Sequence, residues 1–450
     1  MTMATDVIVA ESTPAGRGGI AVVRLTGPCL LSVAEKMSCC KPQPRYAHHV
    51  KVRDESGNII DDALMLYFPG PRSFTGEDVL EFHCHGSPVV VKLITDASIQ
   101  QGARLARPGE FTERAFLNGK MDLAQAEAVA DLIESTTRTA ARSALRSLDG
   151  YFSQQIQQLS GQLTKLRMHV EAAIDFPEEE IDFLHDPVIL EQLEDLKRQF
   201  DHLLEGTRQG CLIREGIRVA LAGKPNVGKS SLMNRLCRED KAIVTHVPGT
   251  TRDVLEQAIQ INGYPVHLVD TAGLRSSRDP VEHEGVRRAK LAVQKADLVL
   301  YLIDSSDFDE LQPFSGIEAL QTDAKVLPVF NKIDVSHWSV GNNVQMGRRA
   351  VNVSVVKDSG IEELKASIVE LAGLQRTEDQ VYTARRRHLY AVQTAHEHLL
   401  SGERQIRQHH SGELLAEELR LSHQKLGEIT GQFSADDLLG EIFSRFCIGK

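Results

Sequence analysis

The sequence predicts a multidomain α/β protein with an α+β N-terminal domain, a discontinuous helical domain and an inserted nucleotide-binding domain. Three observations predict this fold class. Short β-branched runs separated by Gly and Pro fill the first part of the chain. A long stretch with apolar residues at steps of three and four follows. A G-x-x-x-x-G-K-S phosphate loop then occupies residues 223–230, directly after the apolar run 217–222.

Residues 1–118 are expected to form the α+β domain. The runs 7–9, 20–23 and 89–91 are rich in valine and isoleucine, which favour strands. Glycine and proline clusters, such as residues 16–19 and 69–71, separate such runs and favour turns.

Residues 119–215 and 374–450 are expected to form two parts of one helical domain. Apolar residues of the first part recur at a spacing suited to packing on another helix: Phe152, Ile156, Leu159, Leu163, Leu166, Val170 and Ile174. The second part has too little apolar surface to stand alone, so we expect it to pack on the first. Residues 216–373 alternate strand-like and helix-like runs, which predicts an inserted P-loop domain with a mostly parallel sheet.

The phosphate loop predicts a binding site for a nucleoside triphosphate. Its glycines let main-chain N–H groups surround an anionic phosphate, Lys229 neutralises β and γ oxygens, and Ser230 offers a hydroxyl to magnesium. A helix expected to begin near Ser231 adds the positive end of its dipole.

Three further elements follow in the order typical of GTPases. The segment 249–253 supplies a threonine that can close over the γ-phosphate, although it is equally a polar surface turn. Asp270 ends a strand-like run, where it can reach magnesium. Asn331, Lys332 and Asp334 follow another apolar run, and the Asp334 carboxylate can accept hydrogen bonds from guanine N1 and N2. Adenine has no such pair of donors, so the sequence favours GTP over ATP.

Two departures from the common pattern indicate the mechanism. Leu274 stands where small regulatory GTPases place a water-orienting glutamine. Apart from Asp279, Glu282 is the nearest well-placed carboxylate, and its alternative is a solvated residue at a helix start. Asn226 inside the loop can ligate a monovalent cation beside the phosphates, or can be a turn-forming residue after Pro225.

The composition and charge of the chain exclude some classes of function. The 450-residue chain is 42% apolar, and its net charge of -11 argues against nonspecific coating of nucleic acid. Its seven cysteines, with no zinc-like pairs, fit reduced thiols in a cytoplasm, and no run is long enough to span a bilayer. The triple arginine 385–387 can contact RNA phosphates, but a solvated helix start is the simpler interpretation.

At this point the chain resembles the MnmE (TrmE) family of tRNA-modification GTPases, within the TrmE-Era-EngA-like group. The resemblance covers essentially the whole chain. It rests on the domain order, on the segments 249–253 and 270–274, and on two segments specific to this family. These are Arg107 to Phe116 (RPGEFTERAF) and the terminal Cys447-Ile448-Gly449-Lys450.

The resemblance implies a homodimer held by N-terminal folate-binding domains, whose GTPase domains meet when GTP and potassium are bound. It implies a partner, the FAD-containing protein MnmG, with which the dimer installs aminomethyl or carboxymethylaminomethyl groups at C5 of the wobble uridine in certain tRNAs. The implied one-carbon donor is a 5-formyl- or 5,10-methylene-tetrahydrofolate derivative. The implied cofactors of the GTPase are potassium and magnesium.

The resemblance also assigns roles to residues of this chain. Potassium is implied to be bound by Asn226 and by main-chain oxygens of Thr245, Val247 and Thr250. Magnesium is implied to be bound by Ser230 and Thr251. Glu282 is implied to orient the catalytic water, and Lys229 is implied to be the second catalytic residue. The folate positions are Arg24, Glu81 and Lys120, with Lys450 nearby, and Cys447 has a possible role in the modification reaction. The complete GTP-binding set is Asn226, Val227, Gly228, Lys229, Ser230, Ser231, Thr245, His246, Val247, Pro248, Gly249, Thr250, Thr251, Asp270, Thr271, Ala272, Gly273, Asn331, Lys332, Asp334, Ser354 and Val355.

Some alternatives stay open. The pterin ring of a folate can hydrogen-bond a carboxylate, and its glutamate tail can pair with cations. Without the resemblance, Arg24 and Glu81 are more simply interpreted as an ordinary ion pair. Ser354-Val355-Val356 stands where GTPases usually show Ser-Ala-x, so the fifth guanine contact departs from the pattern. The competing functions are a regulatory GTPase in ribosome assembly without folate chemistry, and a folate-dependent transferase whose GTPase domain is a timer.

Overall fold

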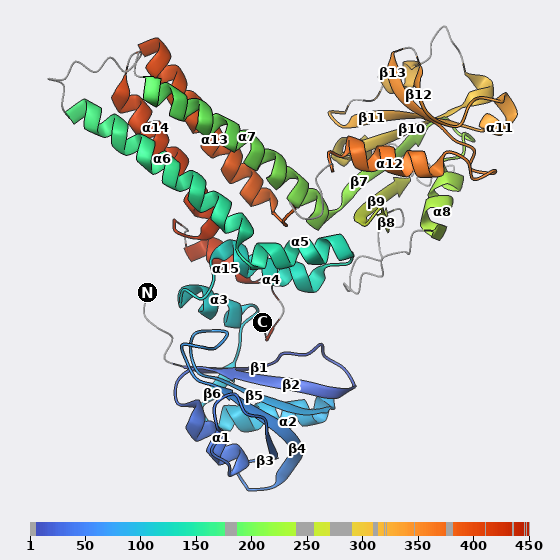
Figure 1. Ribbon diagram of the computed structural model, residues 1–450. Helices are drawn as coiled ribbons and strands as arrows, with labels where there is room; N and C mark the ends of the chain where they lie inside the picture. The colour runs from blue at the N-terminus through green and yellow to red at the C-terminus, as the bar shows by residue number, and fades with distance from the viewer. Residues whose placement is uncertain are drawn as a thin grey trace, which may run out of the picture. The chain divides into compact units, whose positions relative to one another are not determined.

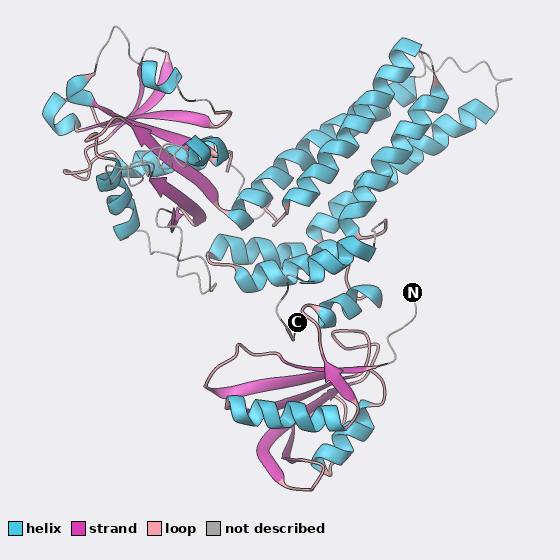
Figure 2. Cartoon of the chain, turned by 180° about the vertical axis from the view of Figure 1, so that it is seen from behind, coloured by secondary structure: helices cyan, strands magenta, loops and turns pink. Residues whose placement is uncertain are grey.

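The structure is a computed structural model of the chain (Figures 1 and 2). It describes residues 6–175, 187–239, 256–270, 290–308, 314–318, 320, 322–345, 347–374, 381–409, 411–433, 436–444, 446, 448 and 449. Contacts divide the chain into two compact units, one of residues 1–130, 147–197 and 394–450, and one of residues 131–146 and 198–393.

The first unit contains a sheet with strand order β3-β4-β5-β2-β1-β6 among the described residues. Its strands are β1 (Val7–Glu11), β2 (Gly18–Thr26), β3 (His48–Arg53), β4 (Ile59–Phe68), β5 (Val79–Gly86) and β6 (Ala103–Leu105). β1 pairs in parallel with β6 and antiparallel with β2. The helices α1 (Leu30–Ser38) and α2 (Pro88–Gln100) pack on this sheet (Figure 1) and bury a core that includes Val23, Leu25 and Ile94.

The same unit contains helices with apolar seams. The helices α6 (Tyr151–Asp175) and α14 (Gly412–Thr430) lie side by side (Figure 1). On α6 the predicted seam residues are buried, except Ile174, which is half-buried. A second cluster joins α15 (Asp436–Ser444) to the start of α4 (Leu123–Glu134), beside α3 (Glu110–Leu117); it contains Leu123, Ala126, Leu439, Ile442, Phe443 and Phe446. The helices α5 (Arg138–Leu148), α7 (Pro187–Glu215) and α13 (Arg386–His409) each contribute residues to both units.

The second unit contains a mostly parallel sheet with order β12-β13-β11-β10-β7-β9-β8 among the described residues. Its strands are β7 (Ile217–Gly223), β8 (Glu256–Ile261), β9 (Tyr264–Asp270), β10 (Leu298–Asp304), β11 (Lys325–Asn331), β12 (Gly341–Gln345) and β13 (Arg348–Asn352). Only β12 with β13 and β8 with β9 pair antiparallel among these strands. The helices are α8 (Lys229–Glu239), α10 (Ser315–Glu318), α11 (Ile333–Ser336) and α12 (Ile361–Leu371), and Ser305–Asp307 form one 3₁₀ turn.

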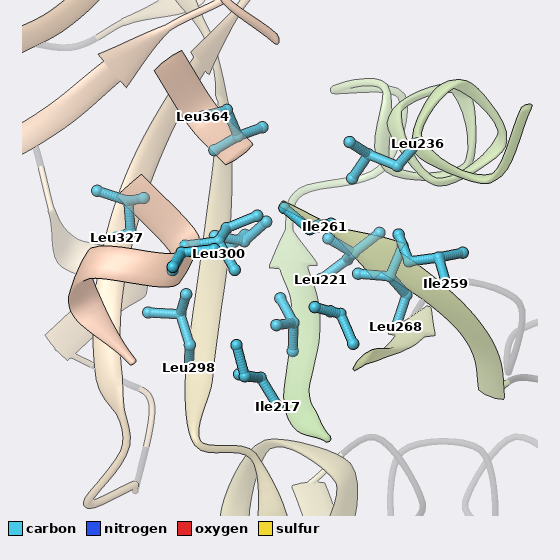
Figure 3. Packing of buried hydrophobic residues seen from close by; sticks show 14 of the residues in the cluster. Ile217, Leu221, Leu236, Ile259, Ile261, Leu268, Leu298, Leu300, Leu327 and Leu364 are labelled. Carbon is cyan, nitrogen blue, oxygen red and sulfur yellow. The ribbon is translucent and has the colours of Figure 1, made fainter. Parts of the chain in front are cut away.

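Apolar side chains from neighbouring strands fill the core of this sheet (Figure 3). Ile217 and Leu221 of β7 lie between Leu268 of β9 and Leu300 of β10, while Leu236 of α8 packs at the same cluster. The mostly apolar runs of β7 and β10 are typical of parallel strands, which are covered on both faces. This core fixes the strand ends that carry the polar residues described below.

The structure confirms the predicted fold class, with an α+β N-terminal sheet, helices and an inserted P-loop fold. The helix after the phosphate loop begins at Lys229, two residues before the predicted start. The boundaries at residues 118, 215 and 373 stay predictions. No described helix is long and apolar enough to cross a membrane.

Candidate GTP-binding site

The polar residues predicted to bind nucleotide lie where parallel strands end. The strands β9, β7, β10 and β11 are neighbours and run in parallel, so their carboxyl ends share one edge of the sheet. Asp270, Gly223, Asp304 and Asn331 are the last residues of these strands. The topology therefore brings together residues that are up to about a hundred positions apart in the sequence.

Two glycines of the phosphate loop stand where no side chain fits. Gly223 has φ 136°, and a Cβ on it would lie 2.3 Å from the carbonyl oxygen of Leu302. Gly228 has φ 101°, and a Cβ there would lie 2.3 Å from Nδ2 of Asn331. Asn226 adopts the left-handed region with φ 63°, which asparagine tolerates better than most residues. The loop therefore wraps closely around the end of β7, as main-chain recognition of phosphate requires.

The buried Lys229 is held on this loop. Its Nζ donates hydrogen bonds to the main-chain oxygens of Gly223 at 3.0 Å and Lys224 at 2.7 Å. Such an ammonium stays at the mouth of the loop, where it can neutralise the oxygens between the β- and γ-phosphates.

The predicted magnesium residues Ser230 and Asp270 contact each other. The hydroxyl of Ser230 donates to Oδ2 of the buried Asp270 at 2.9 Å. A hydroxyl and a carboxylate within hydrogen-bond distance form an oxygen donor set that suits magnesium together with phosphate oxygens. Among the described residues, no group of three or more His, Cys, Asp or Glu side chains is arranged to hold a metal.

The residues predicted to bind guanine make hydrogen bonds among themselves and to the phosphate loop. Nδ2 of Asn331 donates to the carbonyl oxygen of Val227 in the phosphate loop at 2.9 Å, and its Oδ1 accepts from the N–H of Val355 at 3.2 Å. Ser354 Oγ donates to Oδ1 of Asp334 at 2.6 Å. Val355 stands where GTPases usually have alanine, and its main-chain N–H donates to Asn331.

Sequence reasoning missed a further residue of this edge, Asp304. Lys332 Nζ lies 2.6 Å from Oδ2 of Asp304, and the N–H of Ser306 donates to Oδ1. Burial alone raises the pKa of Asp304, but the hydrogen bonds from Lys332 and Ser306 outweigh it and lower the pKa below 3.8. The position of Asp304 at the end of a strand-like apolar run was the available signal.

Several predicted site residues lie outside the described residues. They are Thr245, His246, Val247, Pro248, Gly249, Thr250, Thr251, Thr271, Ala272, Gly273, Glu282, Cys447 and Lys450. Ser231 is described, as an exposed residue in the first turn of α8.

The structure brings together two of the predicted folate residues. Arg24 and Glu81 face each other across β2 and β5, and Arg24 Nε donates to Glu81 Oε1 at 2.8 Å. The other carboxylate oxygen lies 3.0 Å from Nε2 of His83. The guanidinium of Arg24 also lies over the rings of Phe74 and Phe111, 5.7 and 6.0 Å from their centroids. This cluster combines charge with aromatic faces.

Lys120 borders the loop that carries Phe74. Its Nζ donates to the carbonyl oxygen of Pro71 at 2.9 Å, and its side chain lies beside Gly76. Near the chain end, the carbonyl oxygen of Gly449 accepts a hydrogen bond from Ser12 Oγ at 3.1 Å. The residue before Lys450 therefore lies against the N-terminal sheet, just after β1.

The triple arginine is tied into the second unit. Arg385 Nη2 lies 2.8 Å from Oδ1 of the buried Asp131, which also accepts from Arg214 Nε at 2.7 Å. Arg386 Nε donates to Glu215 at 2.8 Å. The Arg385 side chain is only 14% exposed, so the expectation of a solvated helix start is wrong for this residue.

Comparison with known proteins assigns the family. A family model described as the MnmE helical domain matches residues 123–447, and one described as the GTP-binding protein TrmE N-terminus matches residues 7–120. The chain is 48% identical over 454 residues to the tRNA modification GTPase MnmE of Saccharophagus degradans, covering 100% of both chains. It is 51% identical over 456 residues to that of Coxiella burnetii, covering 99% of each.

Among solved structures, the G domain of the T. maritima FeoB iron transporter is 32% identical, with a TM-score of 0.26, over 35% of this chain and 98% of that one. The family assignment stands on the full-length matches and on the family models. The chain belongs to the MnmE family of tRNA modification GTPases, and it is a GTP hydrolase with a role in tRNA modification.

Proposed function

We propose that this chain is a potassium-activated GTPase that works with MnmG to install aminomethyl or carboxymethylaminomethyl groups at C5 of the wobble uridine in certain tRNAs. The one-carbon unit comes from a tetrahydrofolate derivative. The observation that carries the proposal is the gathering of Lys229, Ser230, Asp270, Asn331 and Asp334 at one sheet edge, in a chain similar from end to end to MnmE proteins.

In this proposal, residues at different strand ends bind the phosphates, the magnesium ion and the base of GTP. Lys229 and the loop N–H groups bind the β- and γ-phosphates, while Ser230 and Asp270, together with Thr251, hold magnesium. Asp334 accepts from guanine N1 and N2, and Asn331 ties this base site to the phosphate loop through Val227. When bound, the two metal ions supply positive charge beside the phosphates.

Two further residues act on the reaction itself. Glu282 orients the attacking water, because Leu274 cannot hydrogen-bond it. Asn226 ligates potassium, helped by main-chain oxygens of Thr245, Val247 and Thr250. The exposed position of Asn226 on the phosphate loop supports this role, since its amide oxygen is not buried in the core.

Folate binding is proposed at the cluster of Arg24, Glu81 and Lys120. The Glu81 carboxylate offers acceptors to a pterin edge, and Arg24 and Lys120 offer positive charge to a glutamate tail. The rings of Phe74 and Phe111 beside Arg24 supply faces on which a flat heterocycle can stack. Cys447 and Lys450 are assigned roles near this site.

The assembly is proposed to be a homodimer formed by the N-terminal domains, residues 1–118. The helical domain comprises residues 119–215 and 374–450, and the GTPase domain comprises residues 216–373. The protein acts in the cytoplasm, where its six described cysteines, none of which forms a disulfide, stay reduced.

Nucleoside mass spectrometry of tRNA tests the proposal. A deletion strain is complemented with the parental chain, with Lys229→Ala or with Arg24→Ala. The control is Lys92→Ala, which changes an exposed lysine in the unit that contains Arg24. We expect the parental chain and the control to restore C5-modified wobble uridine, while the other two do not. Full modification without the chain overturns the proposal and favours a ribosome-assembly switch. Normal modification with Arg24→Ala removes the folate assignment only.

A further inference from the structure

An ion pair between two residues outside the predicted motifs joins α8 to the loop after β13. Arg235 Nε donates to Oδ1 of Asp358 at 2.7 Å, and its Nη2 donates to the second carboxylate oxygen. The residues are 123 positions apart. The Arg235 side chain is 18% exposed and that of Asp358 is 51% exposed. Two parallel bonds fix both the distance and the orientation of the carboxylate.

Asp358 belongs to a closed loop that carries the proposed guanine residues. Ser354 and Ser359 exchange two main-chain hydrogen bonds, of 2.9 and 3.1 Å, which close the loop at its base. Asp358, next to this closure, adopts the left-handed region with φ 57°. Aspartate adopts this conformation more readily than most residues with a side chain, and the ion pair holds its carboxylate in place.

A short chain of contacts leads from Asp358 to the base site. The N–H of Lys357, the preceding residue, donates to Ser354 Oγ at 3.1 Å. Because that contact occupies an acceptor site of the hydroxyl, the Ser354 proton is directed to Asp334, 2.6 Å away. This bond fixes one oxygen of Asp334, the residue proposed to accept from guanine N1 and N2.

We propose that Arg235 is a positioning residue for guanine recognition, which acts through Asp358 on the orientation of Ser354 and Asp334. Arg235 lies on α8, the helix that begins with Lys229, so the ion pair couples the phosphate-binding helix to the base-binding loop. The inference rests on the proposed guanine site at Asp334. It adds a specificity-determining contact that neither touches the nucleotide nor belongs to a GTPase motif.

The chemical prediction concerns the base rather than the phosphates. Loss of the ion pair lets the loop and the Asp334 carboxylate move. GDP then loses hydrogen bonds from both N1 and N2, whereas inosine diphosphate, which has no 2-amino group, loses only one. The preference for guanine over hypoxanthine should therefore fall, while turnover at saturating GTP should remain close to the parental rate.

The test compares full-length variants by equilibrium binding of GDP and inosine diphosphate. Arg235→Gln and Asp358→Asn each remove the charged pair, and asparagine still tolerates the left-handed backbone. Arg349→Gln is the matched control, because Arg349 forms another two-bond pair, with Glu370, between β13 and α12 of the same domain. We expect GDP affinity to fall roughly fivefold and inosine diphosphate affinity about twofold in the first two variants, with no change in the control.

The double variant Arg235→Gln/Asp358→Asn completes a cycle. Its loss of GDP affinity should equal that of either single variant, because both remove one interaction. Equal losses for the two nucleotides, or additive effects in the double variant, overturn the inference. Asp334→Asn is measured alongside. If that variant keeps the parental preference, the guanine-site assignment itself fails; if it loses the preference while Arg235→Gln keeps it, only the role of Arg235 fails.

Discussion

Ser354 Oγ donates a hydrogen bond to Asp334 at 2.6 Å, and Ser354 is only 1% exposed. Ser354 lies two residues after β13 and is fixed by main-chain bonds to Ser359, so it is a stationary donor to the carboxylate. A carboxylate held in one orientation binds two neighbouring N–H groups better than a rotating one, because less side-chain entropy is lost on binding.

Asp334→Asn should weaken GTP binding and favour xanthosine triphosphate. The new amide cannot accept from both guanine donors, but its N–H₂ can donate to the C2 oxygen of xanthine. Competition binding of the two nucleotides to the purified variant measures the exchange of preference. Unchanged affinity for GTP would show that the base is bound elsewhere.

Glu110→Gln should destabilise the N-terminal domain by about 3 kcal/mol, since it removes the charge from a buried ionic network. Glu110, which is 3% exposed, accepts from Arg104 Nη1 at 2.9 Å, from the N–H of Arg107 at 2.8 Å and from Arg114 Nη2 at 3.3 Å. Denaturant unfolding of the variant, beside the exposed Glu35→Gln, measures the difference. An equal effect of both substitutions would contradict the structural role.

The same network predicts a pH dependence. Burial alone raises the pKa of Glu110, but hydrogen bonds from Arg104 and the Arg107 N–H outweigh it and lower the pKa below 4.5. A lowered folded-state pKa means that the stabilisation is present above the unfolded value near 4.5 and is lost as the pH falls through the folded pKa. The difference between Glu110→Gln and the parental protein should therefore be full at pH 7 and shrink in acid.

The network gives the segment 107–116 a structural role. Glu110 and Arg114 are spaced by four residues on α3 and pair with each other. Arg114 further reaches Asp6 and Glu77 from other parts of the fold. The motif was recognisable from sequence, but its ionic partners were not, because they come from segments that only the tertiary fold brings together.

The same distinction holds at the GTP site. Strands 217–223, 264–270 and 325–331 were predictable because each is a mostly apolar run that leads into a motif. The pairs Lys332 with Asp304, Arg235 with Asp358 and Arg385 with Asp131 were not, since their partners lie 28, 123 and 254 residues away. Spacing within a motif reports local geometry, whereas a long-range ion pair depends on which elements become neighbours.

Glu282→Ala should leave nucleotide binding nearly intact and lower turnover by on the order of 10²-fold or more, as expected when a water-positioning group is lost. The reason is that the apolar Leu274 replaces the glutamine that usually orients the attacking water. Single-turnover hydrolysis with Asp279→Ala as the control separates the two nearby carboxylates. Parental rates in Glu282→Ala would return that residue to a solvated helix start.

GTP hydrolysis should rise sharply in potassium relative to sodium at equal ionic strength. No motif places an arginine in this chain to neutralise the bridge between the β- and γ-phosphates. A cation held by Asn226 supplies positive charge there, where charge builds up during cleavage, so it stabilises the transition state more than the ground state. Sodium is smaller and leaves the amide, carbonyl and phosphate oxygens too distant to ligate it well.

Asn226→Ala should abolish the difference between the two salts, while Asn262→Ala, a second asparagine with positive φ, should keep it. Asn226 stands at φ 63° on the exposed surface of the phosphate loop, so alanine also strains the backbone there. GDP binding must therefore be measured in both variants to separate a distorted loop from a lost ligand. If potassium brings two GTPase domains together, the stimulation should steepen with protein concentration. Equal rates in both salts, with parental protein above its association range, rule out the cation mechanism.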